Sequence, residues 1–184
     1  MRKISLLLLV SLPSLGADYD VAIRNARVID GSGKAAYRAD IGIKDGRIKA
    51  IGQLGQASAS RTIDARDRVA APGFIDAHTH VEGGIERNPR GDNFLLDGVT
   101  TVITGNCGSS ELNLTAWFDK LEKLGLGLNV ASLVGHNSVR AEVMGSANRL
   151  ATPDEIKRMQ ALVDRAMREG AVGFSTGLEY IPGT

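Results

Sequence analysis

The stretch APGFIDAHTH, residues 71–80, places two of the chain's three histidines one residue apart at the end of a short apolar run. Side chains two positions apart on a β-strand point to the same face, so His78 and His80 are expected to project together. Two imidazoles on one face can hold one metal ion, and zinc suits such ligands. Asp76 shares that face and could orient an imidazole. The pair is therefore either part of a metal site or two surface histidines of a loop.

Composition bounds the class of protein. The 184 residues are 43% apolar and 23% charged, with a net charge of +1 and with basic and acidic residues interspersed. These values predict a globular chain with no nucleic-acid or membrane-surface partner. The single cysteine, Cys107, has no partner for an internal disulfide, so its thiol is expected to be either buried or functional.

Residues 1–17 have the layout of a secretory signal peptide: a basic pair, a short apolar run and small residues. The apolar run is too short to span a bilayer. We therefore expect an exported protein, periplasmic or secreted. The alternative is a buried first strand or helix, which would leave the protein in the cytoplasm.

Residues 18–70 are predicted to form a small antiparallel β unit, the first segment of a β-sandwich. Apolar and polar residues alternate over residues 19–30 and 39–52, as in half-buried strands. Between two such runs, Asp45-Gly46 is a strong hairpin signal because both turn positions need positive φ.

Residues 71–184 alternate short apolar strands with helices. The expected strands cover residues 73–77, 100–104, 128–134 and 171–176, and the expected helices cover residues 93–97, 115–124 and 152–170. In the last helix Thr152 can cap, Pro153 occupies the first helical position and Glu155 completes a capping box. Successive βα units predict a parallel sheet, either open and doubly wound or part of a (β/α)₈ barrel. A whole barrel takes about 250 residues, so the barrel interpretation makes this chain the N-terminal part of a longer protein.

Four segments resemble a known family. APGFIDAHTH is similar to the first-strand signature of the amidohydrolase superfamily, metal hydrolases built on a (β/α)₈ barrel with a small β-sandwich. Three later segments, in the same order, resemble strand ends of its D-aminoacylase group, the N-acyl-D-amino-acid deacylases. They are LDGVTTVITGNCGSS (96–110), SLVGHNSVRAEVMG (132–145) and GAVGFSTGLEYIPG (170–183).

The resemblance implies further metal ligands. In that group the cysteine of the G-N-C-G turn binds metal, which assigns Cys107; a thiolate beside a divalent cation can bridge two ions. The alternative is an inert buried thiol. Some amidohydrolases also take a carboxylate from the end of the fourth strand, where Glu179 stands, although a solvated loop glutamate is equally consistent with the sequence.

Three residues are candidates for substrate binding. Tyr180 matches the group's tyrosine that helps to hold the substrate carboxylate, or it packs over the barrel rim. Arg140 could bind a carboxylate through two parallel hydrogen bonds, or lie on the surface. His136, just past the third strand, could contact substrate or play a structural part.

The resemblance implies hydrolysis of a linear amide in a small molecule, an N-acyl-D-amino acid or a dipeptide, with one or two zinc ions. In the family, histidines of the fifth and sixth strands and an aspartate of the eighth complete the site. This chain contains no such positions, so we expect no catalytic base in it and no activity from it alone. The alternatives are a cyclic-amide hydrolase (dihydroorotase or hydantoinase), whose fourth-strand lysine is missing from residues 173–180, and a non-catalytic truncated product.

Overall fold

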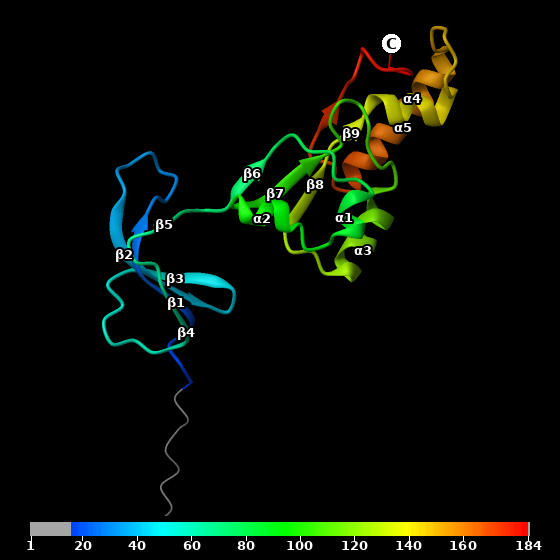
Figure 1. Cartoon of the computed structure of the whole chain (residues 1–184). Helices are drawn as coiled ribbons and strands as arrows, with labels where there is room; N and C mark the ends of the chain where they lie inside the picture. The colour runs from blue at the N-terminus through cyan, green and yellow to red at the C-terminus, as the bar shows by residue number, and fades with distance from the viewer. Residues whose placement is uncertain (1–15, 184) are drawn as a thin grey trace, which may run out of the picture. The chain divides into compact units, whose positions relative to one another are not determined.

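The structure is a computed structural model that describes residues 16–183 (Figure 1). The chain separates into two compact units, with the division between Pro72 and Gly73. The signal-peptide prediction falls on residues 1–17, nearly all of which lie outside the described residues, and it stays a prediction. Within the described part of the chain, no helix is long and apolar enough to cross a membrane.

The first unit is a five-stranded sheet. Its strands are β1 (Tyr19–Val28), β2 (Tyr37–Lys44), β3 (Arg47–Gly52), β4 (Ala59–Asp64) and β5 (Val69–Ala70). The order is β3-β2-β1-β4, and β5 also pairs with β1. The β1–β2 and β2–β3 pairs are antiparallel as expected, whereas β4 and β5 run parallel to β1, so the sheet is mixed rather than wholly antiparallel. The ten residues of β1 make this possible, because β4 and β5 pair with successive parts of one edge.

The predicted hairpin is confirmed. Asp45 and Gly46 have φ of 54° and 66°, and the residues that flank them, Lys44 and Arg47, pair across the two strands. Two successive positive φ values are those of a type I′ turn, whose twist matches that of the strands it joins. Behind the hairpin, small and aliphatic side chains of β1 and β2 form the buried centre of this unit.

The second unit contains the four predicted parallel strands. They are β6 (Phe74–Asp76), β7 (Val99–Thr104), β8 (Asn129–Ser132) continued by β9 (Val134–Gly135), and β10 (Phe174–Ser175). All pairs are parallel, and β6, β7 and β8 lie side by side while β9 pairs with β10 (Figure 1). The spatial order follows the sequence order, whereas a doubly wound sheet reverses its order at a switch point. The topology therefore favours the barrel over the open sheet.

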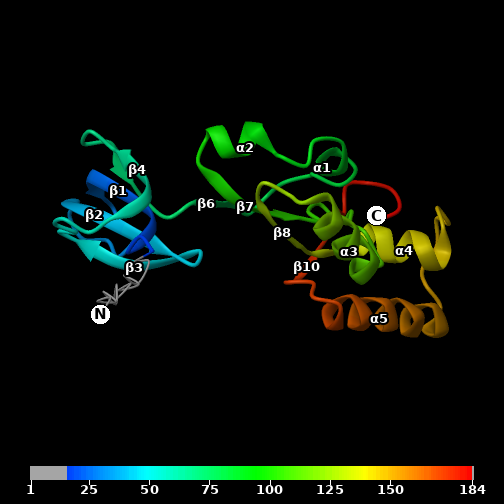
Figure 2. The ribbon, with the colours of Figure 1, turned by 90° about the horizontal axis from the view of Figure 1, so that it is seen from below.

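The helices of this unit are α1 (Gly84–Arg87), α2 (Asp92–Leu96), α3 (Leu114–Leu124), α4 (His136–Met144) and α5 (Pro153–Arg168). The capping box of α5 is present, with Thr152 accepting from the Glu155 N–H and Glu155 accepting from the Thr152 N–H. The sequence patterns predicted neither α1 nor α4. The sequence of α4 has no apolar stripe of helical period, and the helix buries only Asn137 and Val139. It lies beside α5 (Figure 2).

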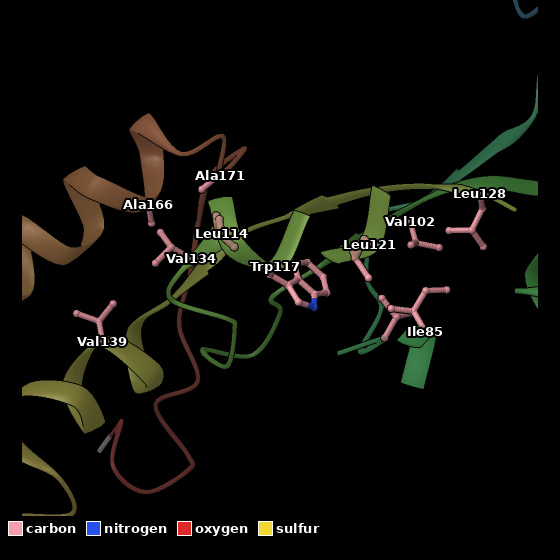
Figure 3. Packing of buried hydrophobic residues seen from close by; sticks show 11 residues of the cluster. Ile85, Val102, Leu114, Trp117, Leu121, Leu128, Val134, Val139, Ala166 and Ala171 are labelled. Atoms are coloured by element: carbon pink, nitrogen blue, oxygen red, sulfur yellow. The ribbon is translucent and has the colours of Figure 1, made fainter. Parts of the chain in front are cut away.

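Apolar side chains from several elements converge between sheet and helices (Figure 3). Leu114, Trp117 and Leu121 form the buried face of α3, at the three- and four-residue spacing that one helix face requires. They belong to one cluster with Val102 of β7 and Val134 of β9. The cluster fixes the strands, and with them the loops that leave their C-terminal ends.

Candidate metal centre

The structure brings His78, His80 and Cys107 together. Their ligand atoms all lie within 4.8 Å of one another. The Cys107 Sγ is 3.4 Å from His78 Nε2, and the two imidazole centroids are 5.7 Å apart. Both histidines are exposed and the cysteine is half-buried, so the group is open to solvent.

The two histidines lie just beyond strand β6, which ends at Asp76. Thr79 between them is buried, and both its N–H and its hydroxyl donate to the Ile103 carbonyl, at 3.0 and 2.9 Å. Anchoring Thr79 inward leaves its two neighbours facing the other way. Asp76, which could orient an imidazole, accepts a hydrogen bond from the backbone N–H of His78 at 3.1 Å and holds the turn after the strand.

Cys107 occupies the turn that follows β7, and its backbone lies in the left-handed region with φ of 54°. For a residue with a Cβ this conformation costs roughly 1–2 kcal/mol. Gly105 and Gly108 also have positive φ, 78° and 81°. A strained non-glycine residue that surrounding structure holds in place is a feature typical of functional sites. Here the strained residue is the one whose thiol approaches His78.

Glu179 and Tyr180 lie in the loop after β10, and both are exposed. Among the described residues, the group that could hold a metal consists of the two histidines and the cysteine and does not include Glu179. The backbone of Tyr180 is fixed, because its N–H donates to the Gly177 carbonyl at 3.2 Å and its carbonyl accepts from the Asn137 amide at 3.3 Å.

His136 and Arg140 belong to α4 and line a cavity of about 570 Å³ whose other walls come mainly from α5. Arg140 donates to the carbonyls of Ala147 and Arg149 at 3.0 and 2.9 Å, so its guanidinium holds the loop that follows its own helix. Among the described residues, the group that could hold a metal does not include His136.

Two side chains that the sequence patterns did not single out contact the turn of residues 105–108, which carries Cys107. Glu82 accepts a hydrogen bond from the Gly105 N–H at 2.7 Å, and the Ser175 hydroxyl accepts one from the Gly108 N–H at 3.0 Å. Glu82 follows His80 by two positions, the same spacing that relates His78 to His80. That spacing is the only pattern from which its proximity could have been inferred.

The donor set is two imidazole nitrogens and one sulfur. Imidazole and thiolate are the ligands that zinc prefers, and carboxylate-poor sites of this kind disfavour magnesium and calcium. The residues present therefore fit a zinc ion. Their position, beyond the C-terminal ends of neighbouring parallel strands, is where parallel α/β folds carry their sites.

A family model described as "Amidohydrolase family" matches residues 61–181. The chain belongs to the amidohydrolase family. A second model, the N-terminal domain of the urease α-subunit, matches residues 13–72 and covers the described part of the first unit.

This amidohydrolase chain is similar to D-aminoacylase of Alcaligenes xylosoxydans xylosoxydans, with 38% identity over 187 residues covering 89% of this chain and 39% of that protein. N-acyl-D-aspartate deacylase of the same organism is 36% identical, covering 94% and 39%. The structure of N-acyl-D-glutamate deacylase from Bordetella bronchiseptica superimposes with a TM-score of 0.85 at 37% identity, covering 90% of this chain and 40% of that one.

The chain thus spans about 40% of the length of the relatives it matches. The resemblance to the D-aminoacylase group is confirmed, and so is the fold class: the N-terminal part of a (β/α)₈ barrel preceded by a small β unit. The four parallel strands of the second unit are the first strands of that barrel.

Proposed function

We propose that this chain forms the N-terminal part of a zinc-dependent hydrolase of linear amides that acts on N-acyl-D-amino acids. The observation that carries the proposal is the convergence of His78, His80 and Cys107 within 4.8 Å at the strand ends. Among the similar structures, one deacylase is described as complexed with zinc and a phosphonate mimic of the tetrahedral intermediate, and a D-aminoacylase as having a binuclear metal centre.

A zinc ion in this family supplies Lewis-acid chemistry: it lowers the pKa of a bound water toward neutrality and polarises the amide carbonyl. The chain's own part is to hold that ion. His78 and His80 offer neutral imidazole nitrogens, and Cys107 offers a thiolate whose negative charge offsets part of the cation's charge. Because a thiolate sulfur can bridge two ions, the same three residues are compatible with one zinc or two.

Tyr180 is the chain's candidate for holding the substrate carboxylate. Its ring is exposed and its backbone is tied at both ends to Gly177 and Asn137, so the phenol is presented from a fixed loop. A phenol hydroxyl can donate a hydrogen bond to a carboxylate oxygen. Arg140 is less suited to this part, since its guanidinium already serves the loop after α4.

The base that activates water and the remaining metal ligands are proposed to come from later strands of the barrel, in the part of the relatives to which this chain does not align. Residues 1–184 alone are accordingly expected to lack deacylase activity. The N-terminal pattern of basic, apolar and small residues supports the further proposal that the protein is exported.

A cyclic-amide hydrolase is the second candidate. D-hydantoinase of Ralstonia pickettii is 41% identical, although over only 92 residues, 50% of this chain and 18% of that protein. Against it, residues 171–183, which include β10 and the loop after it, contain no lysine that could be carbamylated to bridge two metals. The longer matches to the deacylases also favour linear amides.

The experiment uses the protein expressed from its complete reading frame. Zinc content is measured, and hydrolysis of N-acetyl-D-amino acids is compared with that of their L-enantiomers, of L-Xaa-D-Xaa dipeptides and of hydantoins. The variants Cys107→Ala and His78→Ala are expected to lose bound zinc and activity together. His136→Asn is the control for metal content, since the group of possible metal ligands among the described residues does not include that histidine.

Two results would contradict the proposal. One is full metal content and activity in Cys107→Ala. The other is preferential hydrolysis of hydantoins over N-acetyl-D-amino acids, which would support the cyclic-amide alternative.

A further inference from the structure

The four residues Gly105 to Gly108, here named the cysteine turn, make few hydrogen bonds to their own strand. Instead, side chains and backbone from three other strand ends bind them. Because the turn carries the only thiol of the chain, the groups that bind it also determine where that sulfur lies.

Ser175 of β10 closes the turn from one side. Its hydroxyl accepts from the Gly108 N–H at 3.0 Å and donates to the Gly105 carbonyl. One oxygen thus bridges the first and last residues of the turn and fixes the span between them. The residue that projects between these two ends is Cys107.

Glu82 also binds the first residue of the turn. Its carboxylate accepts from the Gly105 N–H at 2.7 Å. Glu82 stands two residues after His80, in the same segment that carries both histidines. Its hydrogen bond therefore ties the histidine-bearing segment to the cysteine-bearing turn, beside the weaker bond that the Asn106 amide donates to the Thr79 carbonyl at 3.4 Å.

The backbone around the turn leaves it little freedom to take another position. A Cβ added at Gly135 would lie 2.2 Å from the Gly108 carbonyl oxygen, so the third strand end is already in close contact with the turn. The Ser138 N–H donates to that same carbonyl at 3.1 Å. Within the turn, the Asn106 amide also donates to the carbonyls of Thr79 and Ile103, at 3.4 and 3.0 Å. Ser175 and Glu82 bind the backbone of Gly105 and Gly108, the two ends of the turn.

We propose that Ser175 and Glu82 are positioning residues for Cys107: they hold the cysteine turn in its left-handed conformation so that the thiolate meets the imidazole of His78 at ligand distance. This inference rests on the proposed function, since it assumes that the three residues bind zinc. Neither residue needs to touch the metal or the substrate; each acts through the backbone of the turn. Partners of this kind typically change metal affinity by about 10- to 100-fold when removed.

The test uses the protein from the complete reading frame, with two metal probes. Zinc affinity is measured by competition with a chelator, and Co²⁺ is added to the metal-free protein to record the thiolate-to-cobalt charge-transfer absorption. Ser175→Ala is expected to lower zinc affinity about 10- to 100-fold and to weaken and shift that absorption. Ser175→Thr keeps the hydroxyl and is expected to restore both.

Glu82 is tested by a matched pair. Glu82→Ala removes the acceptor and is expected to behave like Ser175→Ala, whereas Glu82→Gln keeps an acceptor oxygen and is expected to retain the wild-type cobalt spectrum. Ser138→Ala is the control: its hydroxyl also accepts from a backbone N–H, that of Ser110 at 2.9 Å, but beyond the cysteine turn. It should leave both readouts unchanged.

The outcomes separate the two proposals. If Cys107→Ala leaves zinc affinity and the cobalt absorption unchanged, the proposed metal site itself is wrong. If Cys107→Ala abolishes the absorption while Ser175→Ala and Glu82→Ala leave it and the affinity unchanged, only the positioning proposal is overturned. Should Ser175→Ala fail to fold, the Glu82→Ala and Glu82→Gln pair decides, because equal behaviour of the two would refute positioning by that hydrogen bond.

Discussion

Replacing Gly177 by alanine should damage the metal site without touching any ligand. Gly177 lies in the loop after β10, and a Cβ there would stand 2.1 Å from the carbonyl oxygen of Cys107 and 2.8 Å from its carbonyl carbon. Both are backbone atoms, which cannot rotate away as a side chain can. Any relief must move either the loop or the cysteine turn itself.

The size of the effect follows from these distances. Real Cβ atoms essentially never approach another atom closer than 3.0 Å, so about 1 Å of separation has to be gained. Overpacking of this kind typically costs about 1–3 kcal/mol in the free energy of unfolding. A displacement of about 1 Å at a functional group can cost about 100-fold in function, so zinc affinity is expected to fall by one to two orders of magnitude.

The assay is urea denaturation of the metal-free protein together with chelator competition for zinc, again on the product of the complete reading frame. Gly84→Ala is the control, because a Cβ added at Gly84 would meet no atom within 4 Å and alanine favours the helix α1 in which it lies. A Gly177→Ala protein that is destabilised but binds zinc with wild-type affinity would refute the link between this contact and the thiol.

Two further predictions concern stability. Leu114→Ala removes a side chain that is 0% exposed in the core of the second unit, so the free energy of unfolding should fall by about 2–5 kcal/mol. The control Leu124→Ala, at an exposed position of α3, should change it by less than about 1 kcal/mol. Equal effects of the two substitutions would contradict the assigned helix face. The pKa of Glu155 is lowered to about 2 by hydrogen bonds from the Arg149 guanidinium and the Thr152 N–H. The folded pKa of Glu155 lies below its unfolded pKa, so its contribution to stability is present above about pH 4.5 and is lost as the pH falls toward 2. Glu155→Gln should therefore flatten the dependence of the melting temperature on pH between pH 4.5 and pH 2. An unchanged profile would count against this ion pair.

The elements that the sequence predicted well are those in which local chemistry and packing agree. Asp45-Gly46 favours a type I′ turn between two strands, and the Thr152 capping box specifies the start of α5 from four residues. Helix α4, by contrast, has no such local signal. It begins directly after β9 and is held by the burial of Asn137 and Val139, so tertiary contacts rather than a local pattern determine it. The parallel pairing of β4 with β1 is likewise a long-range choice that alternation along one strand cannot encode.

The candidate site likewise contains some residues that the sequence predicts and others that only the fold brings together. The spacing of His78 and His80 and the glycines around Cys107 are visible in the sequence, and the structure places their ligand atoms within 4.8 Å. The partners of the cysteine turn come from residues 23 and 67 positions away, Glu82 and Ser175. Sequence patterns single out neither residue, because each contact exists only once the parallel strands are in register.

The spacing of two between the histidines holds even though strand β6 ends before them, and the two buried threonines explain why. The Thr104 hydroxyl donates to the Thr79 carbonyl at 3.2 Å and accepts from the Val81 N–H at 3.2 Å. Thr79 in turn donates twice to the Ile103 carbonyl of β7. These bonds replace the ladder that a strand would have made and keep residues 78–81 alternating. By binding β7, Thr79 therefore keeps the side chains of His78 and His80 on the same face of the chain.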